Sequence, residues 1–148
     1  MAQVDGHPIR DEYGIHPAIF QLQRYLVLEM NDIVVTLTAV RAPLFKAGWI
    51  RPGTHVASMG SDASGKQELP PALFHRASLF CDLPAQAVVL GDLKHFSGDA
   101  TRITPIGRVL SGQAPGRKDD QDITGFESAG IALPIHSLET RARCCRMT

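Results

Sequence analysis

The hydrophobic positions of this chain fall into short runs of strand length, separated by stretches with helical spacing. Three of the runs are rich in β-branched and apolar residues, which is typical of buried strands: DIVVTLTA (32–39), THVASMG (54–60) and SLFCD (78–82). The segment between the first two runs, LFKAGWIRPG (44–53), predicts a short helical turn that closes at a Pro-Gly pair.

Three other stretches have the apolar spacing of helices. The first is PAIFQLQRYLVLEM (17–30). The second is ELPPALFHRA (68–77), in which a Pro-Pro pair stands near the helix start. The third, LPAQAVVLGDLKHF (83–96), has Pro84 in its first turn and can be capped by Asp82.

The C-terminal part of the chain predicts a loop followed by a helix. TPIGRVLSGQAPGRKDD (104–120) is loop-like, with a short apolar turn at its centre. Asp120 or Asp122 can cap a helix over ITGFESAGIAL (123–133), and Pro134 should end or kink it.

Strands that alternate with helices predict an α/β domain with a mostly parallel sheet. The length of 148 residues is enough for one domain with a real core. Three or four strands make only half of a large sheet, so we expect one edge strand to stay open.

Composition and charge narrow the classes of partner. The chain is 44% hydrophobic and 20% charged, which is typical of a soluble globular protein. Its 15 basic and 15 acidic residues cancel, which predicts no binding of nucleic acid or of an anionic membrane. No apolar run approaches the roughly 18 residues that span a bilayer, and the N-terminus lacks a signal-peptide pattern, which predicts a cytoplasmic location.

The cysteines and histidines give no metal-binding pattern. Cys81, Cys144 and Cys145 lack the spacing of a zinc site, and we expect buried or merely free thiols. The six histidines form no H-E-x-x-H or similar cluster. The sequence therefore predicts no metal site.

The stretch GSDASGKQ (60–67) has the spacing of a phosphate-binding loop, but its chemistry argues against one. Gln67 stands where a Mg²⁺-binding Ser or Thr is needed, and two prolines soon after remove backbone donors. The negative charge of Asp62 would also oppose a phosphate. These departures argue strongly against a nucleotide triphosphatase.

A second interpretation places the same stretch at the carboxyl end of a parallel strand, where α/β sheets bind ligands. Gly60 would let a cofactor approach the backbone, and Asp62 could accept a proton or orient an amine or water. The alternative for Asp62 is a turn or cap residue. Thr36 and Thr38 share one strand face and could offer hydroxyls to the same crevice, although plain β propensity also explains them.

Three segments resemble the ornithine cyclodeaminase/μ-crystallin family, which includes alanine dehydrogenases and ectoine-utilisation cyclodeaminase-like proteins. They are residues 32–69, residues 107–133 and, more loosely, residues 77–96. The resemblance rests on an ordered set of motifs: D-I-V-V-T-x-T, R-P-G-x-H-V, G-x-D-x-x-G-K-x-E-L and P-G-R…D…I-T…S-x-G. HVASMGSD is most similar to the ectoine-utilisation branch.

This resemblance implies a Rossmann-type NAD-binding domain, which in the family joins a separate dimerisation and substrate domain and forms homodimers. It implies a partial Rossmann-like NAD-binding domain over 30–133, with atypical segments at 1–29 and 134–148. No G-x-G-x-x-G precedes DIVVT, so the first βαβ half is expected to be missing. Arg108 stands where the family usually has Glu.

The resemblance also implies roles for particular residues. Asp62 matches the acid that handles the substrate amine and the proton transfers, and Ala129 matches a substrate contact. Lys66, in the turn after Asp62, could keep that carboxylate ionised and lower its pKa. The positions that match the nicotinamide side of the NAD site are Thr38, Met59, Gly60, Ser61, Lys66 and Ser128.

The functional hypothesis is therefore NAD-dependent deamination and cyclisation, or reduction, of a small α-amino acid or imine. Because the pyrophosphate motif and the family's upstream substrate residues are lacking, we expect this chain to be a truncated and inactive form. The alternative is a non-enzymatic binding module derived from the same domain.

Overall fold

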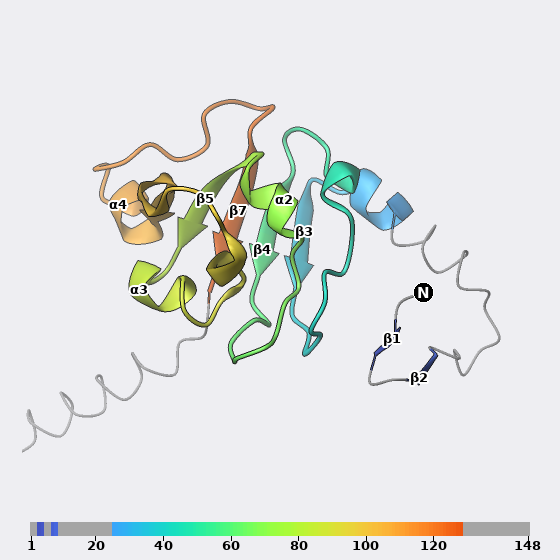
Figure 1. Cartoon of the computed structure of the whole chain (residues 1–148). Helices are drawn as coiled ribbons and strands as arrows, with labels where there is room; N and C mark the ends of the chain where they lie inside the picture. The colour runs from blue at the N-terminus through green and yellow to red at the C-terminus, as the bar shows by residue number, and fades with distance from the viewer. Residues whose placement is uncertain (1–2, 5–6, 9–24, 129–148) are drawn as a thin grey trace, which may run out of the picture.

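Five parallel strands form the central sheet of this structure, a computed structural model that describes residues 3–4, 7–8 and 25–128 (Figure 1). Each strand pairs with its neighbours in parallel. In spatial order the strands are β3 (Ile33–Thr36), β4 (His55–Ser58), β7 (Ile123–Glu127), β5 (Ala77–Cys81) and β6 (Ile103–Pro105). The predicted parallel α/β sheet is confirmed.

Short helical segments connect the strands. Residues 25–29 form a helical segment just before β3. The remaining segments are η1 (Ala47–Trp49), α2 (Pro71–Phe74), α3 (Pro84–Ala87), η2 (Asp92–His95), η3 (Ala100–Arg102) and α4 (Ile106–Leu110). A separate pair of two-residue strands, β1 (Gln3–Val4) and β2 (His7–Pro8), is antiparallel.

One face of the sheet packs against these connections and forms the core. Leu73 of α2, Ile50 after η1 and Val56 of β4 are each at most 1% exposed and belong to one apolar cluster. Burying such a side chain stabilises the fold by about 1.5–3 kcal/mol. Pro71 stands at the start of α2, where a backbone N–H has no partner within the helix, so the lack of an N–H in proline costs no hydrogen bond. The helix that follows places Leu73 and Phe74 in this core.

The helix predicted over 123–133 is wrong, because residues 123–127 form strand β7 at the centre of the sheet. A strand that is buried on both faces, as β7 is, shows little alternation, so its short run can be mistaken for a helix segment. Asp122 caps no helix there; its carboxylate accepts hydrogen bonds from the Ser78 hydroxyl and the Lys118 backbone N–H, both at 3.1 Å.

The continuous helix predicted over 83–96 is also wrong. Helix α3 ends at Ala87 and η2 begins at Asp92. Between them, a Cβ on Gly91 would overlap the carboxylate of Glu127, so any larger residue here would have to displace that side chain. The Asp82 carboxylate accepts a hydrogen bond from the backbone N–H of Leu83, the residue at the N-cap position of α3.

The segment predicted as a loop, 104–120, begins in regular structure. Its apolar turn is confirmed as α4, but strand β6 just before it was not predicted. β6 is only three residues long and ends in Pro105, which gives it a weak strand pattern.

Other predicted elements are confirmed within the described residues. Strands β3, β4 and β5 lie in the three predicted runs, and the turn after η1 closes at Gly53, whose φ is +83°. Cys81 is a free, fully buried thiol, and burial raises its pKa to about 11.

Some of the sequence-based expectations fall outside the described residues: most of the helix over 17–30, the atypical ends of the chain, Pro134, Cys144 and Cys145. In the part of the chain that the structure describes, no helix has the length and apolar character needed to cross a membrane.

Candidate functional site

The carboxylate of Glu68 accepts hydrogen bonds from residues at the carboxyl ends of both β3 and β4. Its Oε1 accepts hydrogen bonds from the backbone N–H and the hydroxyl of Thr38, at 2.6 and 2.7 Å. Its Oε2 accepts from the backbone N–H of Gly60 at 2.8 Å and from the hydroxyl of Thr36 at 3.0 Å. Glu68 is 0% exposed, so these bonds replace its hydration.

The protonation state of Glu68 follows from the same contacts. Burial raises the pKa of Glu68, but the hydrogen bonds from Thr38, Gly60 and Thr36 outweigh burial and hold the pKa below its ordinary value. Glu68 is therefore an ionised, buried carboxylate, and its hydrogen bonds are of the strong, charge-assisted kind. The hydroxyls of Thr36 and Thr38 therefore donate their protons to this carboxylate rather than to a ligand.

Gly60 is a glycine because the protein itself fills the space of a side chain. A Cβ on Gly60 would overlap the backbone of Thr38 and come within 2.7 Å of Glu68 Oε1. Its φ is not in the left-handed region, so the requirement is purely one of space. The close packing of the Gly60 backbone against the Thr38 backbone therefore requires glycine at position 60.

A second layer of buried acids lies beneath this carboxylate. Asp92 Oδ1 accepts from the backbone N–H of Glu68 at 2.9 Å. The Ser58 hydroxyl lies 2.6 Å from Asp92 Oδ2 and 3.1 Å from Glu68 Oε2, and donates its single proton to one of them at a time. Glu127, at the end of β7, accepts from the backbone N–H of Leu93 at 2.8 Å.

Glu127 is held in its protonated form by its surroundings. Its Oε1 is buried and meets no hydrogen-bond partner among the described residues. Burial, together with the negative charges of Asp92 and Asp82, raises the pKa of Glu127 to about 8. The buried layer therefore ends in a carboxyl group that holds its proton to a much higher pH than an exposed glutamate does.

The loop after β4 presents Asp62 at the rim. Lys66 Nζ lies 2.5 Å from Asp62 Oδ1, and the side chains are 26% and 52% exposed. The hydrogen bond from Lys66 holds the pKa of Asp62 below its ordinary value, as the sequence predicted. The Ser61 hydroxyl and Lys94 Nζ both donate to the carbonyl of Lys66, at 3.1 and 2.7 Å, which closes the loop.

The remaining predicted site residues lie at the same edge of the sheet, to which the strand arrowheads point in Figure 1. Met59 follows β4 and is 39% exposed. Ser128 follows β7; its N–H donates to the carbonyl of Ser58 at 3.1 Å and its hydroxyl to Asp82 Oδ2 at 2.7 Å. Ala129 lies outside the described residues.

The sequence therefore predicted the exposed residues of this site, such as Asp62 and Lys66, but not the buried acids next to them. Glu68, Asp92 and Glu127 were not singled out, although Glu68 belongs to the quoted G-K-x-E-L motif. The available signal was an acid placed directly before the apolar Leu-Pro-Pro stretch, where a solvent-exposed charge is out of place.

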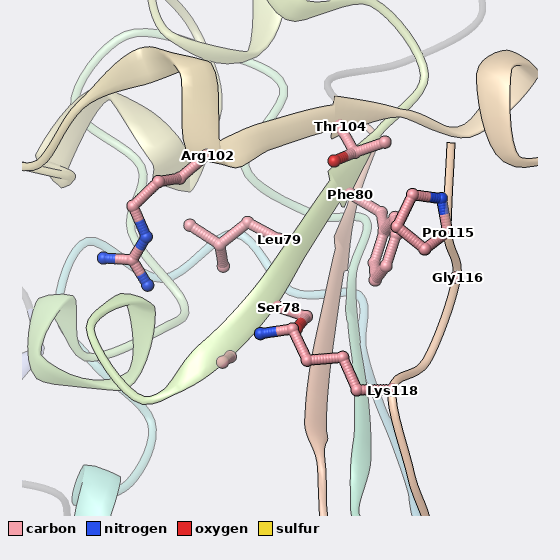
Figure 2. Close-up of a pocket in the computed structure, with 9 residues that line it drawn as sticks. Ser78, Leu79, Phe80, Arg102, Thr104, Pro115, Gly116 and Lys118 are labelled. Atoms are coloured by element: carbon pink, nitrogen blue, oxygen red, sulfur yellow. The ribbon is translucent and has the colours of Figure 1, made fainter. Parts of the chain in front are cut away.

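A cavity elsewhere on the sheet does not form a second site of this kind. It lies along β5, and its lining includes Ser78, Arg102, Thr104 and Lys118. Figure 2 shows that Arg102 and Lys118 reach this strand from different elements, and none of the described residues that line the cavity is acidic. Arg102 lies over the ring of Phe96, 5.5 Å from its centre.

The parallel sheet, with polar residues gathered at its carboxyl edge, defines a partial Rossmann-type dinucleotide-binding fold. The iminosuccinate reductase of Paracoccus denitrificans, solved in complex with NAD⁺, has a similar structure, with a TM-score of 0.63 and 36% identity. That similarity covers 66% of this chain and 31% of the reductase.

The chain belongs to the ornithine cyclodeaminase/mu-crystallin family, whose model matches residues 21–138. It is 36% identical over 107 residues to alanine dehydrogenase from Archaeoglobus fulgidus, covering 69% of this chain and 33% of that protein. It is 34% identical over 108 residues to ornithine cyclodeaminase from Agrobacterium fabrum, covering 72% of this chain and 30% of the relative. The chain thus spans about a third of the length of these relatives, and the predicted family resemblance is confirmed.

The packing around Gly60 gives a first prediction. Gly60→Ala should lower the free energy of unfolding by about 1–3 kcal/mol, because the new methyl group has no space between Thr38 and Glu68. Gly107→Ala is the matched control: Gly107 lies in α4, nothing is within 4 Å of its Cβ position, and alanine should be neutral or slightly stabilising. Urea unfolding measures the free energy of unfolding of both variants. Equal stability of the two would contradict the packing described around Gly60.

The buried Glu127 gives a prediction about pH. Its folded pKa of about 8 lies above the ordinary 4.5, so its protonated form stabilises the fold below about pH 4.5 and this stabilisation is lost as pH rises to about 8. Between pH 5 and 8.5, wild type should therefore lose stability relative to Glu127→Gln, by at least about 1.4 kcal/mol, the value of one pKa unit.

Thermal unfolding of both proteins across this range measures that difference. The control is Asp120→Asn, at an exposed position, which should keep the wild-type pH dependence. Parallel stability curves for wild type and Glu127→Gln would show that Glu127 titrates normally in the folded chain.

Proposed function

We propose that this chain supplies the nicotinamide-facing wall of an NAD(H) site in an enzyme that acts on a small α-amino acid or its imine. The observation that carries the proposal is the edge at which Glu68 joins Thr38 to Gly60, beside Asp62 and Lys66. Membership of the family and the NAD⁺-bound relative support it.

The residues at this edge fit the nicotinamide end of the cofactor. The hydroxyl of Thr38 donates its proton to Glu68, so its lone pairs stay available to accept from an amide N–H. Met59 offers a partly exposed apolar surface for a ring, and Ser61, whose hydroxyl is used within the loop, would contribute its backbone. The remaining members of the proposed wall are Gly60, Lys66 and Ser128. When bound, NAD would supply the hydride acceptor and donor.

Asp62 is proposed as the acid/base group for the substrate. It is ionised, half exposed and lies on the loop after β4, where it can pair with a substrate ammonium group and accept its proton. Lys66 keeps the carboxylate charged until a substrate amine takes over as its partner. Ala129 is the proposed substrate contact beyond β7.

Relatives named for iminosuccinate reduction, alanine dehydrogenation and ornithine cyclodeamination support an amino-acid or imino-acid substrate. We expect the 148-residue chain by itself to bind NADH weakly and not to turn over, because it spans about a third of these relatives. Contacts to the rest of the cofactor normally provide the binding energy that orients the reacting ring.

A second candidate function is a non-enzymatic binding module. The observation that favours it is β3, which lies at the end of the sheet among the described strands, with exposed apolar side chains at Ile33 and Val35 and at Leu37 just after it. Such an edge can add a strand from another polypeptide.

The proposed function is tested by NMR titration of the chain with NADH. We expect binding in the millimolar range, with amide shifts of Thr38, Gly60 and Ser128, and no change at Ser78 or Lys118 beside the other cavity. Asp62→Asn should retain NADH binding but weaken binding of ornithine or alanine to the NADH-loaded protein, because it removes the charge that pairs with the amine. The absence of NADH shifts at this edge, or shifts with Mg-ATP instead, would contradict the proposal.

A further inference from the structure

We propose that the cavity along β5 is a binding site for a short dicarboxylate, with Arg102 and Lys118 as its two cationic contacts (Figure 2). The cavity has a volume of about 190 Å³. Its lining includes Ala77 and Ser78, the first residues of β5, whereas the candidate NAD site lies at the carboxyl ends of the strands. The proposal therefore stands independently of the proposed function.

The unequal lengths of the strands open the sheet at this place. β7 pairs with β5 along its whole length, from Ala77 to Cys81. The short strand β6 pairs with β5 only at Leu79–Cys81. Among the described strands, Ala77 and Ser78 therefore have no partner on the β6 side, and both line the cavity. Backbone groups left open in this way are available to a polar ligand or to water.

The cavity carries positive charge, and its described lining contains no acidic residue. Its cationic groups are the guanidinium of Arg102 and the ammonium of Lys118, and neither forms an ion pair with a carboxylate of the described residues. Arg102 lies over the ring of Phe96, 5.5 Å from its centre, which orients the guanidinium while its N–H donors stay available. Cations without a carboxylate partner favour an anionic ligand.

The polar groups around these cations are arranged so that Lys118 can use its side chain for a ligand. The carboxylate of Asp122 accepts hydrogen bonds from the Ser78 hydroxyl and the backbone N–H of Lys118, both at 3.1 Å. These bonds attach the loop before β7 to β5, and they do not involve Lys118 Nζ. The hydroxyl of Thr104, which also lines the cavity, makes no hydrogen bond to another described residue and can donate to an anion.

The size and the apolar part of the lining define the class of anion. Leu79, Phe80 and Pro115 offer apolar surface between the polar groups. The volume lies below the roughly 300–1,000 Å³ of sites for drug-sized ligands, so the ligand has about four to six carbons. Because the two cations come from different elements, they match two carboxylates joined by a short carbon chain. Inorganic phosphate would leave the apolar surface without a contact.

NMR titration of the full chain with glutarate at near-neutral pH and low salt tests the proposal. We expect a dissociation constant in the millimolar range, with amide shifts at Ser78, Gly116 and Lys118 and none at Thr38 or Gly60. Added NaCl should weaken the binding, because it screens exposed charges. Glutaramide, a neutral molecule of the same length, and inorganic phosphate should each bind about tenfold more weakly.

Lys118→Gln removes one cation but keeps the backbone N–H that Asp122 accepts from, and it should raise the dissociation constant for glutarate about threefold. Arg102→Gln should have an effect of the same direction. The control is Lys46→Gln, which removes the same charge from an exposed position outside the cavity and should bind like wild type. Circular dichroism shows that each variant is folded.

Several results would overturn the proposal. They are the absence of shifts beside the cavity at about 50 mM glutarate, shifts at Thr38 and Gly60 instead, and wild-type binding by both cavity variants. Equal affinity for glutaramide would show that the two charges are not recognised. Phosphate binding as tight as that of glutarate would show that the carbon chain is not recognised, which would overturn the assignment to a dicarboxylate.

Discussion

The rest of this structure depends on one buried negative charge, the carboxylate of Glu68. Two parallel strands that end side by side leave backbone N–H groups without partners, and here one side chain accepts from Thr38 and Gly60 at once. A charge with 0% exposure is tolerated only because four donated bonds from Thr36, Thr38 and Gly60 stabilise it. The geometry of the candidate site is therefore a consequence of satisfying this charge.

The buried layer explains several sequence features as one system. Gly60 and Gly91 are the two positions where a Cβ would collide with the carboxylates of Glu68 and Glu127. Asp92 is held between Ser58 and the backbone of Glu68, so η2 is bound to the strand ends. The surroundings lower the pKa of Glu68 and raise that of Glu127, so these two buried acids ionise in different ranges of pH. The exposed rim, with Asp62 and Lys66, lies on the loop that follows β4, next to this buried layer.

The sequence predicted much of the fold and the exposed residues of the site, but not the buried strand β7 or the buried carboxylate of Glu68. The β-branched runs of β3 and β4 and the proline at the start of α2 are local signals, and they were interpreted correctly. β7 was mistaken for a helix, since burial on both faces removes the alternation that marks a strand. The position of Lys66 in the turn after Asp62 predicted their ion pair. Glu68 was missed because its role depends on contacts 30 residues away in sequence, with Thr38.

The stability of Glu68→Gln tests the central claim most directly. The amide places an N–H₂ group where a backbone N–H of Thr38 or Gly60 now finds an acceptor, and an unsatisfied buried donor costs about 1–3 kcal/mol. The account predicts a loss of at least that size in urea unfolding, with faster hydrogen exchange at Thr38 and Gly60. Gln67→Ala, the neighbouring control whose side chain makes one long bond to the carbonyl of Leu69, should change little. If Glu68→Gln were as stable as wild type and as protected at these two amides, the buried charge would not organise the site.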